Sequence, residues 1–120
     1  MELQLETLNS VYDYLPNLYK GIVEIGNLFA GGNHAEGYYQ LQLALEGLRW
    51  VTEALSLTKE AQKEEIDVSP LAEIVKQLIE GIENNDPIAI WDLLEYETLP
   101  LLEAWDLSIE KSIQPDKKEV

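Results

Sequence analysis

The spacing of the apolar residues constrains the fold of this chain more than any other feature of the sequence. These residues recur every three or four positions along almost the whole chain, and no segment shows the strict alternation that is typical of a half-buried strand. The longest run steps by three and four residues in turn: Leu8, Val11, Leu15, Leu18, Ile22, Ile25 and Phe29. Such a run is the seam that one helix presents to another in a bundle. The sequence therefore predicts an all-α fold.

The residues between the periodic segments divide the chain into four predicted helices. Gly31 and Gly32 suit the end of the first helix, and Asn33, with Glu36 three residues later, resembles a cap for the second. Ser69 is a favourable cap for the third helix. The predicted helices span residues 3–30, 34–63, 70–84 and 87–110.

The stretch "ENNDP" predicts both the end of the third helix and the start of the fourth. Asn84 or Asn85 can take the left-handed conformation that closes a helix, Asp86 can cap the next one, and Pro87 suits its first position. So short a connection makes these two helices antiparallel neighbours, and the connection "AGGN" does the same for the first two. We therefore predict an antiparallel four-helix bundle built from two helical hairpins.

Two prolines lie inside predicted helices. The apolar stripe of the first helix keeps its phase across Pro16, and that of the fourth helix keeps its phase across Pro100. The stripe of the fourth helix consists of Trp91, Leu94, Thr98, Leu101, Trp105 and Ile109. A proline inside a helix removes one hydrogen bond and displaces the carbonyl four residues earlier, here that of Tyr12 or Tyr96. We predict two kinked helices, with a true break into two short helices as the alternative at each proline.

The size and composition of the chain fit one helical domain. It has 120 residues, of which 46% are hydrophobic, enough for one core but not for two. We place the domain at residues 1–110 and expect residues 111–120 to form a frayed polar tail. Cysteine is absent, which excludes a disulfide or a thiolate site. The acidic N-terminus does not resemble a signal peptide and no apolar run approaches the ~18 residues of a membrane span, so we expect a cytoplasmic protein.

A large excess of acidic residues limits the possible partners. Asp and Glu number 23 against 8 Lys and Arg, which gives a net charge of −15. Such a surface repels nucleic-acid backbones and anionic membranes, so we expect neither as a partner. Three uses of the charge are left: it keeps the protein soluble, attracts a basic partner, or mimics nucleic acid.

Patterns that would indicate catalysis or metal binding are sparse. A di-iron site in a helical bundle needs Glu-x-x-His on two helices, and His34 is the single histidine. Carboxylates alone could hold Mg²⁺, with Glu80 and Glu83 facing Asp92 and Glu95. All-helical nucleotide pyrophosphohydrolases use paired acidic motifs of this kind, but no cluster of Lys or Arg stands nearby to bind phosphates. We therefore expect no cofactor and favour a non-enzymatic role, with a Mg²⁺-dependent nucleotide phosphohydrolase as an alternative.

A second apolar set lies off the main stripes of the second and fourth helices. It consists of Tyr39, Leu43, Trp50, Tyr96, Leu99 and Leu107. A helix that is apolar on two sides is either deeply buried or part of an interface. We predict that this set is the contact surface of a protein-interaction or assembly protein. A homodimer is the commonest use of such a surface, and a groove for an amphipathic helix of another protein is the alternative.

Three stretches resemble a known group of proteins: "LPNLYKGIVEIGNLFAGGN", "LEGLRWVTEALSLTKE" and "NDPIAIWDLLEYETLPLLEAW". They look like small acidic α-helical proteins of Bacillus-type Gram-positive bacteria, which are described as domains of unknown function, and the likeness covers most of the chain. This resemblance implies a bacterial, cytoplasmic helical bundle and carries no activity. The rhythm of the hairpins is also similar in type to small acidic export chaperones of the flagellar system, which bind amphipathic helices.

Overall fold

The computed structural model describes residues 2–114, and every regular element within them is helical. The α-helices are α1 (Glu2–Ala30), α2 (His34–Ser56), α3 (Ser69–Glu83), α4 (Pro87–Leu93) and α5 (Leu99–Ile113). A short 3-10 helix, η1 (Lys59–Ala61), follows α2, and one π-helical turn, η2 (Leu94–Thr98), joins α4 directly to α5. No strand occurs in this part of the chain, which confirms the predicted all-α class.

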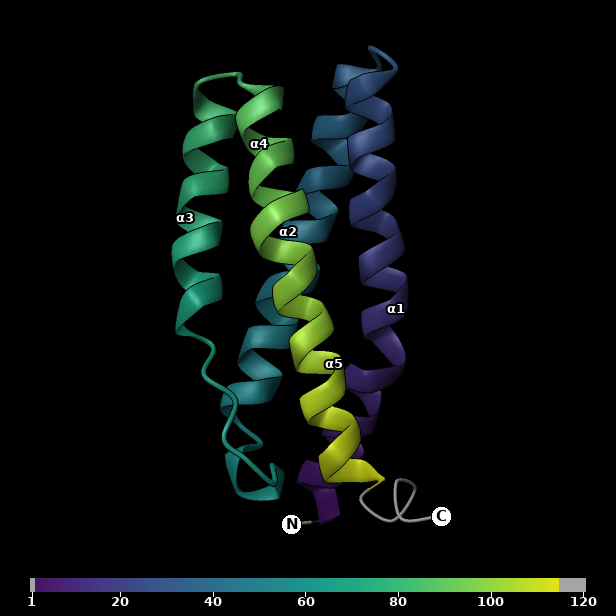
Figure 1. Ribbon diagram of the computed structural model, residues 1–120, viewed down its shortest axis with the longest axis vertical. Helices are drawn as coiled ribbons and strands as arrows, with labels where there is room; N and C mark the ends of the chain where they lie inside the picture. Colours follow the sequence, from purple (N-terminus) through teal and green to yellow (C-terminus); the bar gives the residue numbers. More distant parts are fainter. Residues whose placement is uncertain (1, 115–120) are drawn as a thin grey trace.

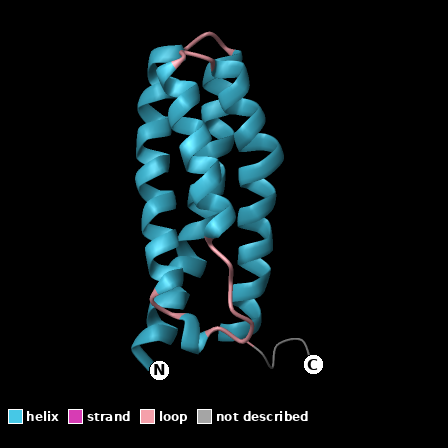
Figure 2. Ribbon diagram, turned by 90° about the vertical axis from the view of Figure 1, so that its left-hand side faces the viewer, coloured by secondary structure: helices cyan, strands magenta, loops and turns pink. Residues whose placement is uncertain are grey.

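The helices lie side by side along the long axis of the molecule, which measures 46 × 26 × 20 Å (Figure 1). Because α4, η2 and α5 form one continuous rod, the chain packs as four helical rods. The α1–α2 and α3–α4 connections lie at the same end, and the longer α2–α3 connection lies toward the other (Figure 2). α1 packs against both α2 and α5, and α3 packs against α4. None of the helices within residues 2–114 combines the length and apolar character that crossing a lipid bilayer requires.

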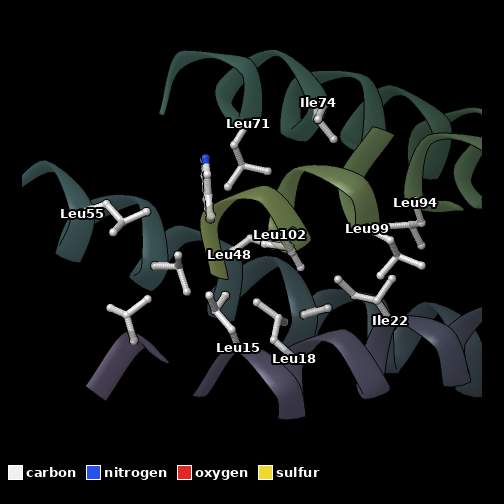
Figure 3. Packing of buried hydrophobic residues seen from close by; sticks show 14 of the residues in the cluster. Leu15, Leu18, Ile22, Leu48, Leu55, Leu71, Ile74, Leu94, Leu99 and Leu102 are labelled. Carbon is white, nitrogen blue, oxygen red and sulfur yellow. The ribbon is translucent and has the colours of Figure 1, made fainter. Parts of the chain in front are cut away.

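The predicted seam of α1 is buried along its whole length. All seven of its residues, from Leu8 to Phe29, are at most 8% exposed. They belong to the same buried cluster as side chains of the other rods, such as Leu48 of α2, Leu71 of α3 and Leu102 of α5 (Figure 3). Burial of apolar surface is the main stabilising contribution to folding, so this shared core is what holds the four rods together.

The α1–α2 connection is closed by backbone hydrogen bonds. Gly32 has a φ of 82°, a left-handed conformation that glycine adopts without strain. The Asn33 amide donates to the carbonyl of Leu28 at 2.8 Å, and the Asn33 side chain makes no capping bond to α2. The prediction that glycines end the first helix is confirmed. Asn33 does occupy the N-cap position of α2, where its carbonyl accepts from the Gly37 amide at 3.0 Å. The predicted side-chain capping bond was wrong, because the Asn33 side chain makes none.

The caps of α3 and α4 differ from each other. Asp86 caps α4 as predicted, since its Oδ1 accepts from the Ala89 amide at 3.1 Å, and Asn85 takes the left-handed conformation with a φ of 49°. Ser69 is already the first residue of α3, and its amide donates to Asp67 Oδ1 at 3.0 Å. The prediction of Ser69 as the cap was therefore wrong. Val68 occupies the cap position, and the Asp67 side chain accepts the Ser69 amide.

α2 ends at Ser56, earlier than the predicted boundary at residue 63. The Thr58 hydroxyl donates back into the last turn of the helix, and the side chain of Gln62 is buried beneath the connection. Gln62 donates to the Leu55 carbonyl at 2.8 Å and accepts from the Ile66 amide at 2.8 Å. These bonds satisfy buried polar groups of an irregular connection. The predicted boundary was wrong because residue spacing alone does not distinguish this buried glutamine from one on a helix surface.

Both internal prolines lie in continuous helical rods. α1 runs through Pro16 from Glu2 to Ala30. Pro100 follows η2, in which the Leu99 amide donates to the carbonyl five residues earlier, that of Leu94. A π turn adds one residue to the helix and moves every later residue by about 100° around the axis. The predicted stripe was wrong at Leu101, which is half-buried while Leu102 after the π turn is buried, and Trp91 is also only half-buried. Leu94, Thr98, Trp105 and Ile109 are buried as predicted.

The last helix continues beyond its predicted end at residue 110. α5 reaches Ile113, and the Ser112 hydroxyl accepts from the Lys63 amide at 2.8 Å, which ties this end of α5 to the α2–α3 connection. The rest of the predicted polar tail, residues 115–120, lies outside the described part of the chain.

Candidate interaction surfaces

The structure leaves five of the six predicted contact residues exposed. They are Tyr39, Leu43, Trp50, Tyr96 and Leu107. The sixth, Leu99, is only 7% exposed and points into the core beside Leu94 (Figure 3). The prediction for Leu99 was wrong because the π turn just before it rotates this residue inward.

The three residues of α2 form one row together with a tyrosine of α1. Tyr39, Leu43 and Trp50 lie at helical spacing on the exposed side of α2. The Tyr14 ring packs edge-on against the Trp50 ring, with a centroid distance of 5.5 Å and an interplanar angle of 88°. Gly47 makes room for this contact, because a Cβ at that position would overlap the Tyr14 hydroxyl. We call the four aromatic and aliphatic residues Tyr14, Tyr39, Leu43 and Trp50 the α1–α2 surface.

Few charged residues line the hollows beside the α1–α2 surface. Two shallow hollows of about 410 and 150 Å³ share Tyr14 and Leu43 among their lining residues. The other residues that line them are Asn17, Leu18, Gly21, Gln40, Ala44, Glu46, Gly47 and Trp50. Glu46 is the one ionisable carboxylate in this set. A patch of aromatic and aliphatic side chains among neutral amides is typical of the core of a protein–protein interface.

The remaining predicted contact residues lie on other parts of the molecule. Leu107 belongs to α5 and lines a hollow between α1 and α5. Tyr96 projects from η2, and a hydrogen bond to Glu95 raises the pKa of its phenol above the ordinary value. The structure thus divides the predicted set into a row on α2, a residue in the α1–α5 hollow, an isolated tyrosine and a buried leucine.

The hollow between α1 and α5 has a volume of about 460 Å³, and we call it the α1–α5 groove. Its lining residues are Leu15, Pro16, Tyr19, Lys20, Leu102, Glu103, Asp106 and Leu107. Two hydrogen bonds join the helices on either side of it. The Tyr12 hydroxyl donates to Glu110 Oε2 at 2.9 Å, and the Tyr19 hydroxyl donates to Glu103 Oε1 at 2.8 Å.

Both bridges lie close to this hollow, and the residues between them on α1 help to explain it. Tyr12 and Tyr19 are seven residues apart on α1, and so are Glu103 and Glu110 on α5, so the bridges lie roughly 10 Å apart along antiparallel helices. Between them α1 presents the compact ring of Pro16, which cannot reach across to α5. The space that a longer side chain would fill stays open above the apolar floor.

Carboxylates line the α5 edge of this groove. Glu103, Asp106 and Glu110 share one side of α5 at helical spacing. Burial and the neighbouring Glu110 charge raise the pKa of Asp106, and the hydrogen bond to Glu110 raises the pKa of Tyr12. Within residues 2–114 one ion pair occurs, between Lys59 and Glu65, so no cation of the described chain is paired with these three carboxylates.

The carboxylates considered for Mg²⁺ do not form a compact cluster. Glu80, Glu83 and Asp92 are exposed and Glu95 is half-buried. In the part of the chain that the structure describes, no group of three or more His, Asp or Glu side chains is placed to hold a metal ion. The structure therefore does not bring these four residues together as the predicted alternative requires.

Sequence reasoning missed the residues that shape both surfaces. Tyr14 was not assigned to the row of α2, and Tyr12 and Tyr19 were not recognised as partners of α5. Tyrosines seven residues apart, flanking the α1 seam, are a signal that could have indicated a second contact edge. Their glutamate partners lie more than eighty residues away in the sequence, so only the packing of α1 against α5 identifies them.

Comparison with known proteins gives a family without an assigned function. Residues 6–108 match the family DUF8042, described as a domain of unknown function. No curated protein and no solved structure shows a significant match. The match covers nearly the whole described bundle, from the first turn of the α1 seam to the last turns of α5. The chain therefore belongs to the DUF8042 family of domains of unknown function.

Proposed function

We propose that this chain is a non-enzymatic protein-interaction or assembly protein that forms a homodimer through the α1–α2 surface. In this proposal the fold is an antiparallel four-helix bundle of two helical hairpins, with its rods kinked at Pro16 and Pro100. A bacterial, cytoplasmic setting is part of the same proposal and rests on the resemblance to small acidic helical proteins of Bacillus-type bacteria.

The observation that carries the proposal is the combination of exposed aromatic residues and low charge on the α1–α2 surface. Trp50 is 42% exposed and Tyr39 and Leu43 are exposed beside it, although a stable core is complete without them. Tryptophan and tyrosine contribute most to binding in protein interfaces. A second copy presents the same residues, so a two-fold axis through this surface pairs apolar side chains with apolar side chains.

The net charge of the chain opposes dimerisation and supplies a test. Each copy carries −15, so association brings like charges together at the rim of the interface. Salt screens charges that are more than about 10 Å apart at 0.1 M ionic strength. A dimer held by an apolar surface should therefore become stronger as salt rises from low values.

Sedimentation velocity of the wild type and two variants tests the homodimer. We expect a dimer for the wild type at micromolar concentration, with tighter association at the higher of two salt concentrations. Trp50→Glu should be a folded monomer, because it places a charge in the apolar contact. Ile79→Glu is the matched control on α3, since Ile79 is 43% exposed, and it should dimerise like the wild type.

Several outcomes would overturn the homodimer. A monomeric wild type at both salt concentrations would do so and would favour the export-chaperone-like alternative, in which the surface binds an amphipathic helix of another protein. If circular dichroism showed Trp50→Glu to be unfolded, Leu43→Glu would replace it, because Leu43 is 46% exposed. A folded Leu43→Glu that still dimerised would place the interface elsewhere.

A titration with Mg²⁺ tests the enzymatic alternative separately. The Mg²⁺-dependent nucleotide phosphohydrolase predicted as an alternative would bind the ion at Glu80, Glu83, Asp92 and Glu95. We expect no localised change in the NMR spectrum of these residues. Shifts confined to the four would contradict the non-enzymatic proposal whatever the oligomeric state.

A further inference from the structure

We propose that the α1–α5 groove binds an amphipathic helix of another protein, with an apolar side chain of that helix above Leu15 and Leu107 and its lysine or arginine side chains beside Glu103, Asp106 and Glu110. This inference does not depend on the homodimer, because the groove and the α1–α2 surface lie on different sides of α1. The α1–α2 surface lies on the side of α1 that packs against α2, and the groove lies on the side that packs against α5.

The groove is held open by the structure. The Tyr12–Glu110 and Tyr19–Glu103 bridges join α1 to α5 beside the hollow, and Tyr19 and Glu103 are among its lining residues. Both helices are anchored beneath it by fully or almost fully buried leucines, Leu15 of α1 and Leu102 of α5. The hollow therefore persists without a ligand, and an occupant need not separate the helices in order to bind.

The dimensions of the groove indicate the size of the contact. Its lining residues span positions 15–20 of α1 and 102–107 of α5, about one and a half helical turns or roughly 8 Å along the bundle. Its volume of about 460 Å³ falls within the range of about 300–1,000 Å³ that is usual for pockets that bury a ligand. A helix that lies across or along it can insert one or two large apolar side chains, with its neighbouring turns resting on the rim.

The charges at the rim indicate the chemistry of the partner. Two carboxylates, Glu103 and Asp106, and one basic residue, Lys20, line the groove, and none of them forms an ion pair within residues 2–114. Glu110 lies further along the same side of α5, where it accepts from Tyr12. Glu103 and Glu110 each accept one tyrosine hydroxyl and keep further acceptor positions for a donor from outside. A cationic helix would bring opposite charge to this edge, whereas a second copy of this chain would bring another −15.

Binding of designed peptides to the full chain, followed by NMR, tests the inference. The probe is an amphipathic helical peptide of leucine and lysine. One control peptide has glutamate in place of lysine, and the other has alanine in place of leucine. We expect the leucine–lysine peptide to bind most tightly, to shift the amide signals of the groove residues, and to bind more weakly as salt rises.

Substitutions in the chain separate the groove from the general negative charge. Leu107→Glu should weaken binding of the leucine–lysine peptide by roughly tenfold, because it removes an apolar contact at the centre of the groove. It also adds a negative charge, which by itself would strengthen the attraction to lysine. Ile79→Glu adds the same charge on α3 and should leave the affinity unchanged or slightly higher. Asp106→Asn should weaken binding a few-fold.

Four results would overturn the inference. Equal binding of the alanine–lysine peptide would show that charge alone attracts the probe, and equal binding of the leucine–glutamate peptide would show that charge has no role. Equal affinities of Leu107→Glu and Ile79→Glu would show that the groove is not the site. Groove signals that shift with chain concentration in the absence of peptide would identify a second copy as the occupant. If Leu107→Glu disturbed the fold, Leu107→Gln would serve in the same comparison.

Discussion

Two glycines set the distance between helices at the scale of single residues. A Cβ on Gly26 of α1 would lie 2.6 Å from ring atoms of Trp91, and one on Gly47 of α2 would overlap the Tyr14 hydroxyl. Each aromatic ring therefore rests directly on the backbone of the neighbouring helix. Both glycines lie inside helices, where they cost about 1 kcal/mol relative to alanine, so close packing is the reason that the helices tolerate them.

Replacement of Gly26 by alanine should destabilise the protein. The gain in helix propensity is about 1 kcal/mol, but overlap with a rigid indole costs about 1–3 kcal/mol, so we expect a net loss of about 1 kcal/mol. Urea unfolding followed by circular dichroism measures this change. In a Trp91→Leu background the overlap is relieved, and the same substitution should become stabilising. A Gly26→Ala protein that is more stable than the wild type would show that the Trp91 ring moves aside at little cost.

At the scale of elements, the π turn η2 decides how the rod of α4 and α5 fits the bundle. It stands directly before Pro100, where a regular α-helix would suffer a clash between the proline ring and a carbonyl. The added residue also moves Leu99 and Leu102 into the core. The side chain of Thr98 is fully buried within this turn, and its hydroxyl donates to the Leu93 carbonyl at 3.1 Å.

Removal of the Thr98 hydroxyl should therefore lower the free energy of unfolding more than removal of a similar hydroxyl from a regular helix. Thr98→Val keeps the shape of the side chain but removes a hydrogen bond inside the turn, and we expect a loss of about 1 kcal/mol. Thr52→Val is the control, because the Thr52 hydroxyl donates to the Leu48 carbonyl at 2.9 Å within regular α2. Chemical denaturation of both variants gives the comparison. Equal losses would mean that the Thr98 hydroxyl has no special role in the π turn.

At the scale of the whole molecule, the charge is distributed unevenly around α1. Glu46 is the one carboxylate that lines the hollows beside the α1–α2 surface. Glu103 and Asp106 line the α1–α5 groove together with Lys20, and Glu110 lies next to them on α5. This difference is the reason that the two surfaces are assigned different occupants, a second copy for the first and a basic helix for the second. The carboxylates beside the groove also lie close enough to one another for Glu110 to raise the pKa of Asp106.

Burial of Asp106 and its repulsion by Glu110 should make the free energy of unfolding depend on pH. Burial and the charge of Glu110 raise the pKa of Asp106 in the folded state above its ordinary value near 3.9. A group with a raised folded-state pKa supports the folded state fully below the unfolded pKa, and this support is lost as pH rises through the folded pKa. The groups around Asp106 are Tyr12, Tyr19 and Lys20 of α1 and Glu103 and Glu110 of α5.

Asp106→Asn cannot ionise, so it should not undergo this loss. We expect its stability relative to the wild type to increase as pH rises from about 4 to 7. Urea unfolding at several pH values measures the difference, and Asp92→Asn on the exposed side of α4 removes the same charge as a control. If the two variants depended on pH in the same way, the effect would belong to net charge and not to the position of Asp106.

The sequence by itself determined the class of the fold and the ends of several helices. The regular seam from Leu8 to Phe29 predicted α1 because helical spacing is a local property of the chain. Gly32, Asn85 and Asp86 marked helix ends because left-handed conformations and caps depend on a few neighbouring residues. Helical spacing also separated Tyr39, Leu43 and Trp50 from the main stripe of the second helix, and all three are exposed. Their role as a contact surface stays a prediction.

The tertiary structure alone decided which residues face one another. A single added residue in η2 buried Leu99 and Leu102, and a spacing argument cannot foresee it because the π turn is accommodated by packing around Pro100. Gln62 became buried because carbonyl and amide partners converge on it from both sides of the α2–α3 connection. The α1–α5 groove likewise depends on contacts between residues that only the packing of the helices brings together. Its two bridges join residues that are far apart in the sequence, so neither the hollow nor its acidic edge exists until α1 and α5 have packed together.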